Sequence, residues 1–125
     1  MDPKKRLRLD QRLRNQAAFK NLVDTGTFAR GVFFYVWAGC QDKVGQKAKK
    51  ERPVIGIIVS RRTDPRATKR NILKRRVREI FRRNQGSLKS GSACLVKTRQ
   101  LKEWPSYVAM EEELLALFKK TGTWT

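Results

Sequence analysis

The sequence predicts a small α+β domain in the order helix, strands, helix, strand, helix. Two segments, 31–38 and 53–59, are rich in β-branched and aromatic residues, which is typical of strands. Apolar residues recur at helical spacing in 66–84 and again after Pro105. A length of 125 residues suits one domain, so we expect residues 1–125 to fold as a single unit.

The first half of the chain predicts one helix and two strands. The helix is expected over 15–24, with Asn15 as its N-cap and Gly26 after its end. In the strand 31–38, alternation places Phe33, Tyr35 and Trp37 on one face. The segment 53–59 predicts a second, more buried strand. We expect these two strands to be antiparallel neighbours across a Lys-rich loop.

The second half predicts helix, strand, helix. A long helix should run over 66–84, with Pro65 near its first turn. A strand is expected over 92–97, followed by a last helix that Pro105 opens and Gly122 ends. We expect the three consecutive residues Glu111, Glu112 and Glu113 in that last helix to contribute to solubility and to interact favourably with the helix macrodipole.

The net charge of +19, from 30 Lys and Arg against 11 Asp and Glu, indicates a polyanionic partner. The segment 61–83 alone holds eleven basic and two acidic residues. The chain has no His, which excludes His-based acid–base, metal and Ser-His-Asp chemistry. Cys40 and Cys94 are expected to be buried apolar residues in a reducing compartment.

No segment has the pattern of a secretory signal, because charge returns soon after the basic start of the chain. The longest apolar run, 32–38, is far below the roughly 20 residues of a membrane helix. We therefore expect a cytoplasmic protein.

The helix 66–84 has one apolar and one basic side when its residues are placed at 100° intervals. The apolar side holds Leu73, Val77, Ile80 and Phe81. The basic side is a stripe of Arg70, Lys74 and Arg78, with Asn71 and Arg75 beside it and Arg82 extending it. A solvated charged face would normally mix signs, and this one does not. Because guanidinium groups grip phosphates bidentately, the stripe predicts a polyanion-binding surface.

The aromatic face of strand 31–38 has two interpretations. Exposed rings beside a basic groove would stack on unpaired bases. Alternatively, Phe33, Tyr35 and Trp37 belong to the core, and the pattern alone favours the core.

The stretch Ala67–Glu79 resembles the Arg-Asn-Arg signature A-x-x-R-N-x-x-K-R-x-x-R-E of the bacterial ribonuclease P protein subunit. The strand Val54–Val59, followed by Ser60, Arg61 and Arg62, is similar to the segment that precedes this signature in the family. The resemblance covers nearly the whole chain, from Lys5 to Phe118.

The resemblance implies an α-β sandwich of the ribosomal protein S5 domain 2-like type, in the order α-β-β-(β)-α-β-α with a left-handed βαβ crossover. It implies a monomer in a 1:1 complex with a catalytic RNA that removes the 5′ leader of precursor tRNA. The RNA would require Mg²⁺ and perform the hydrolysis, so no catalytic residue, cofactor or metal is expected in the protein. DNA and membranes are not expected partners. Residues 1–12 would form a flexible basic tail.

The resemblance also assigns residues to two surfaces. Those implied to bind RNA are Arg61, Arg62, Lys69, Arg70, Asn71, Lys74, Arg75, Arg78 and Arg82. Those implied to line a cleft for the single-stranded leader are Phe19, Val23, Tyr35 and Trp37.

The chain departs from the family pattern at three places. Ile72 replaces the second Arg of the signature, and Val23 replaces an aromatic residue. The segment 63–66 replaces a Gly before the helix and has one extra residue, so the turn there is expected to differ. The alternative function is a structural RNA-binding protein of ribosomal type without a processing role. A DNA-binding regulator would instead need a second short helix beside the basic one.

Overall fold

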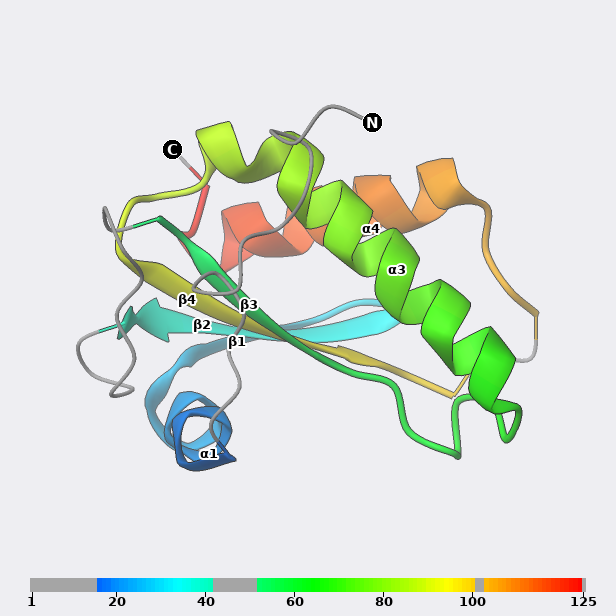
Figure 1. Cartoon of the computed structure of the whole chain (residues 1–125). Coiled ribbons are helices and arrows are strands. Elements are labelled where there is room, and N and C mark those ends of the chain that lie inside the picture. Colours follow the sequence, from blue (N-terminus) through cyan, green and yellow to red (C-terminus); the bar gives the residue numbers. More distant parts are fainter. Residues whose placement is uncertain (1–15, 42–51, 101–102, 125) are drawn as a thin grey trace.

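The computed structural model describes residues 16–41, 52–100 and 103–124, which form a mixed four-stranded sheet flanked by helices (Figure 1). The sheet order is β1-β2-β4-β3, with β3 and β4 parallel and the other neighbours antiparallel. The strands are β1 (Thr27–Arg30), β2 (Phe34–Cys40), β3 (Val54–Ile58) and β4 (Ser92–Thr98). The predicted α+β class is confirmed.

Helices cover both faces of the sheet. Figure 1 shows α1 (Gln16–Thr25) below it, and α3 (Ala67–Asn84) and α4 (Tyr107–Lys120) above it. A single 3-10 turn, η4 (Gln85–Ser87), follows α3. All three predicted helices are thus confirmed. The expected N-cap Asn15 and the basic tail 1–12 lie outside the described residues.

The unit β3–α3–β4 is a parallel crossover, which needs a long connection such as a helix. In Figure 1, α3 passes above the sheet while β3 lies nearer the viewer than β4, and this makes the crossover left-handed. The fold therefore has the unusual handedness that the family resemblance implies.

The predicted pairing of the two apolar strands is wrong, because β4 lies between β2 and β3. All but one of the seven residues of β4 are buried, so this strand takes a central position that needs apolar side chains on both faces. The residue pattern did not predict β1, whose four residues pair with residues 35–38 of β2; it corresponds to the additional strand in the order that the family resemblance implies. Its side chains are mostly exposed, so no apolar pattern marks it.

Two cores result from the helices on opposite faces. The larger core joins the sheet to α3 and α4, and the four predicted apolar residues of α3 all belong to it. The smaller core lies between α1 and the sheet. There Ala18 and Leu22 of the helix pack on Val54, Ala93 and Leu95 of the strands.

The turn between β1 and β2 is bound by a carboxylate from α4. The backbone N–H groups of Val32, Phe33 and Phe34 donate to the carboxylate of Glu113 at 2.7, 2.8 and 3.0 Å. A Cβ at Gly31 would overlap that carboxyl group. Glu113 is therefore a structural anchor, and the expected role in solubility is wrong for it.

This anchor explains why β2 begins at Phe34 and not at residue 31. Because the N–H groups of Val32 and Phe33 donate to Glu113, these two residues precede the strand. Phe33 accordingly packs against the larger core, together with Phe34. It does not share a face with Tyr35 and Trp37 as the alternation predicted.

The two cysteines differ in environment. Cys94 is buried in the larger core, and this burial raises the pKa of its thiol to about 12. Cys40 is exposed at the end of β2, so the prediction of burial is wrong for it. Alternation along β2 would place Cys40 on the buried face with Phe34, Val36 and Ala38, but Cys40 is exposed because the strand ends there.

Candidate nucleic-acid interface

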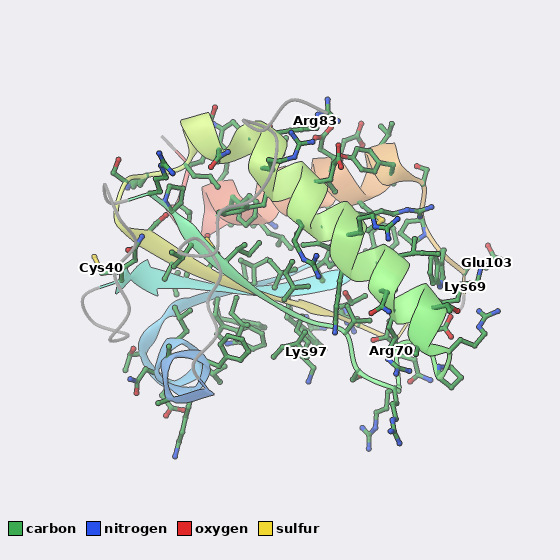
Figure 2. All side chains as sticks on the ribbon, viewed as in Figure 1. Cys40, Lys69, Arg70, Arg83, Lys97 and Glu103 are labelled. Carbon is green, nitrogen blue, oxygen red and sulfur yellow. The ribbon has the colours of Figure 1, made fainter. Side chains whose placement is uncertain are left out.

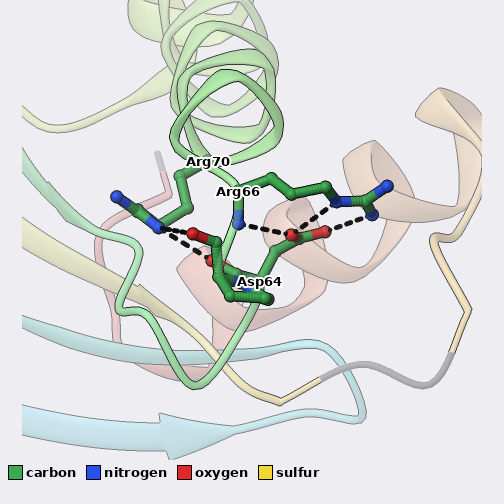
Figure 3. A network of polar contacts seen from close by, with 4 residues as sticks. Asp64, Arg66 and Arg70 are labelled. Atoms are coloured by element: carbon green, nitrogen blue, oxygen red, sulfur yellow. Dashed lines mark hydrogen bonds and ion pairs between the residues drawn. The ribbon is translucent and has the colours of Figure 1, made fainter.

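The turn that leads into α3 is held by a network around Asp64 (Figure 3). The carboxylate of Asp64 accepts from the backbone N and the guanidinium of Arg66, at 2.8 to 3.0 Å. The hydroxyl of Thr63 donates to the carbonyl of Thr98 at 3.0 Å, which ties the turn to β4. The segment that departs from the family pattern is thus ordered by its own side chains.

Arg70 closes the same network. Its Nη1 donates to the backbone carbonyls of Asp64 and Pro65, at 3.0 and 2.8 Å (Figure 3). The first Arg of the signature therefore supports the turn before α3. Its remaining N–H groups point away from these carbonyls and are available for other acceptors.

The hydrogen bonds from Arg66 lower the pKa of Asp64 to about 2, against 3.8 as an ordinary value. Since the pKa is lower in the folded protein, this stabilisation is full above about pH 4 and is lost as the pH falls towards about 2. We expect the difference in melting temperature between the native chain and Asp64→Asn to be constant near neutral pH and to shrink over that window. Thermal unfolding across pH measures it. A difference that persists undiminished at about pH 2 would contradict this role of Asp64.

Most of the predicted basic residues lie along one side of α3, and we call this side the outer stripe. It consists of Arg70, Lys74, Arg78 and Arg82, with Asn71 and Arg75. Asn71 and Arg75 are exposed and the others are half-buried. Arg82 pairs with Glu79 at 2.6 Å. Arg61 and Arg62 are exposed in the turn before the helix.

Lys69 does not belong to the outer stripe. Its ammonium lies 5.6 Å from the ring centre of Trp104, on the side of α3 that faces α4. Lys69 and Arg70 are adjacent in the sequence, but their side chains leave the helix in directions 100° apart. In Figure 2, Lys69 extends towards the Glu103 side, whereas Arg70 lies at the turn.

The opposite face of the sheet carries an aromatic cluster beside α1, which we call the aromatic face. It consists of Phe19, Phe28, Tyr35 and Trp37. Phe28 lies with its ring centre 5.1 Å from that of Trp37 and 5.7 Å from that of Tyr35. Tyr35 and Trp37 are half-buried. This exposure is compatible both with stacking on bases and with packing in the protein.

Phe28, which is 47% exposed, was not among the residues predicted for this surface. It pairs directly with Trp37 across the β1–β2 hairpin. The sequence signal that could have indicated Phe28 was an aromatic residue two positions after Gly26, the glycine that follows the first helix. Val23, predicted in the cleft, is 46% exposed on α1.

A hollow of about 490 Å³ lies at the end of the aromatic face. Its wall includes Tyr35, Lys97, Arg99 and Arg62. The guanidinium of Arg99 stacks on Tyr35 at 4.9 Å and donates to the carbonyl of Gly31 at 2.7 Å. Figure 2 shows Lys97 below the sheet, on the side of α1. Lys97 and Arg99 are basic residues of this region that the sequence analysis did not single out.

Comparison with known proteins assigns the chain to a family. The ribonuclease P family model matches residues 7–122. The chain belongs to the ribonuclease P protein family.

Individual ribonuclease P proteins agree with this assignment. The chain is 32% identical to the ribonuclease P protein component of Thermotoga petrophila, over 88% of this chain and 91% of that protein. It is 36% identical to that of Nitrosomonas europaea, but this match spans only 54% of this chain and 56% of the relative. The solved ribonuclease P protein of Thermotoga maritima superposes with a TM-score of 0.70 at 33% identity, covering 87% of this chain and 96% of that one.

Residues 16–41, 52–100 and 103–124 contain no group of three metal-ligating His, Cys, Asp or Glu side chains. No helix in those ranges is both long and apolar enough to span a bilayer.

Proposed function

We propose that this chain is the protein subunit of a ribonuclease P ribonucleoprotein and binds both the catalytic RNA and the 5′ leader of precursor tRNA. The hollow beside Tyr35 is the observation that carries this proposal. Its wall contains Tyr35 from the aromatic face and Arg62 from the turn before α3. A single RNA strand can therefore pass from stacking side chains to the basic helix without leaving the protein surface.

The two surfaces suit two kinds of RNA contact. The outer stripe, with Arg61 and Arg62, offers guanidinium and ammonium donors for phosphates of the folded RNA. The aromatic face offers Phe19, Tyr35 and Trp37 to unpaired bases of the leader, and Phe28 extends it. Lys97 and Arg99 lie in the wall of the hollow and neutralise phosphates of the leader.

The division of labour follows from the residue types. Among residues 16–41, 52–100 and 103–124 the basic surfaces carry no paired carboxylates, and the chain has no His; this supports the proposal that the protein binds while the RNA performs the hydrolysis with its own Mg²⁺. The protein is proposed to act in the cytoplasm as a monomer bound 1:1 to the RNA. By neutralising phosphates, it lowers the Mg²⁺ concentration that the RNA needs.

Trp37→Ala tests the leader contact. Stacking contributes about 1–3 kcal/mol per base, so we expect the preference for leader-bearing over mature tRNA to fall about tenfold. Affinity of the protein for the catalytic RNA should change little. The measurement is binding of both tRNA forms to the reconstituted complex.

Val108→Ala is the matched control, because Val108 is 63% exposed on α4, on the other face of the sheet. It should leave the preference unchanged. Equal losses for leader-bearing and mature tRNA after Trp37→Ala would show that Trp37 only packs. If the wild-type protein binds the RNA but does not assist processing at low Mg²⁺, the ribosomal-type alternative is favoured.

A further inference from the structure

The side of α3 that faces α4 carries a second set of cations, which we call the inner row. It consists of Lys69, Arg76 and Arg83, spaced seven residues apart. At 1.5 Å per residue the row is about 20 Å long. It lies on the opposite flank of the buried face from Lys74 and Arg78, so α3 is basic along both flanks.

Each cation of the inner row lies over an aromatic ring near the start of α4. Lys69 and Arg76 both lie 5.6 Å from the ring centre of Trp104, and Arg83 lies 5.8 Å from that of Tyr107. Both rings are half-buried against the larger core, which fixes their positions. Three long, flexible side chains are thus aligned by two rigid rings.

This arrangement leaves hydrogen-bonding capacity unused. Stacking occupies the face of a guanidinium group, while its N–H donors lie in the plane and point outwards. Among residues 16–41, 52–100 and 103–124, neither Lys69 nor Arg76 has a carboxylate within ion-pair distance. Only Arg83 is partly neutralised, by Glu111 at 3.7 Å.

We propose that the inner row is a second phosphate-binding surface for RNA, with Trp104 as the positioning residue for Lys69 and Arg76. The occupant is the phosphate backbone of a helical RNA segment, because a cation lies over each of the two rings and the row presents positive charges at regular intervals along one side of the helix. The inference rests on the proposed function, since the RNA is that of the same ribonucleoprotein. α3 then lies between two RNA segments and holds them together.

The test compares Arg76→Gln with the native full-length chain in binding to ribonuclease P RNA over a range of KCl concentrations. Loss of one phosphate contact should make the negative slope of log K against log salt shallower by about 0.9 and weaken binding about fivefold near 0.15 M. Lys119→Gln is the matched control, because Lys119 also lies over a Trp ring, that of Trp124, at 5.2 Å. It is outside the inner row and should leave the slope unchanged.

Variants of Trp104 test its positioning role separately. Trp104→Tyr keeps an aromatic ring and should bind RNA nearly as the native chain does. Trp104→Leu should weaken binding about threefold at an unchanged charge, because the two cations lose their alignment. Where Trp104→Leu unfolds, the Arg76→Gln comparison still decides.

An unchanged slope for Arg76→Gln would overturn the inner row as an RNA contact. That outcome differs from failure of the proposed function, in which the native chain itself does not bind ribonuclease P RNA. If Lys74→Gln weakens binding and Arg76→Gln does not, α3 contacts RNA through the outer stripe alone.

Discussion

Glu113→Gln is expected to lower the free energy of unfolding by about 2–4 kcal/mol. The carboxylate accepts three backbone N–H groups of the β1–β2 turn, and the residues involved are some 80 positions apart in the chain. An amide of the same shape has only one acceptor oxygen and turns its NH₂ group towards donors. At least one N–H group of the turn then has no acceptor.

The anchor also supports the aromatic face. Phe34 is the first residue of β2, and Tyr35 follows it directly. Arg99, which stacks on Tyr35, donates to the carbonyl of Gly31 in the same turn. We therefore expect Glu113→Gln to weaken leader binding in addition to stability, since the turn positions both Tyr35 and Arg99.

Glu112→Gln is the matched control, because Glu112 is the adjacent residue of α4 and is exposed. It removes the same charge and should change stability by less than about 0.5 kcal/mol. Chemical denaturation of both variants measures the difference. Equal effects would mean that the helix charge matters and the three hydrogen bonds do not.

The helices were predictable from the sequence because their signals are local. The spacing of Leu73, Val77, Ile80 and Phe81 locates the buried face of α3, and Ser106 caps α4 through the N–H of Ala109. The positions of the strands in the sheet were not predictable in this way. Strand order depends on which segments cover which faces of the sheet. The position of β4 between β2 and β3 therefore produces no local pattern in the sequence.

The candidate site shows the same limit. Residue types predict a basic stripe and an aromatic strand, but not the partners of each side chain. Arg70 binds two carbonyls of the turn before α3, and Lys69 lies over a ring more than thirty positions away. Phe28 joins the aromatic face through hairpin pairing with Trp37. Such contacts join distant parts of the chain, and periodicity does not report them.

The triple variant Lys74→Gln, Arg75→Gln and Arg78→Gln is expected to weaken binding to ribonuclease P RNA roughly 100-fold near 0.15 M salt. Each lost phosphate contact makes the negative slope of log K against log salt shallower by about 0.9, so the magnitude of the slope should fall by nearly 3. Arg70 is left in place because its loss would also disturb the turn at Asp64 and Pro65. Binding titrations over a range of salt concentrations measure both quantities.

The matched control removes three charges elsewhere, with Lys89→Gln, Lys119→Gln and Lys120→Gln. All three residues are exposed and lie outside α3. Long-range attraction alone should then account for a loss of a few-fold, because salt screens charges beyond about 10 Å. Equal losses for the two triple variants would refute a defined phosphate-binding stripe.

The same triple variant is expected to affect stability in the opposite direction. Arg70, Lys74 and Arg78 are like charges at i, i+4 spacing, and each such pair destabilises a helix by a few tenths of a kcal/mol. Removing Lys74 and Arg78 in the triple variant should leave the melting temperature of the free protein unchanged or slightly higher. The like charges of this surface would then stabilise the complex with RNA and slightly destabilise the free protein. If the melting temperature falls with the affinity, these side chains support the fold and their loss weakens binding only indirectly.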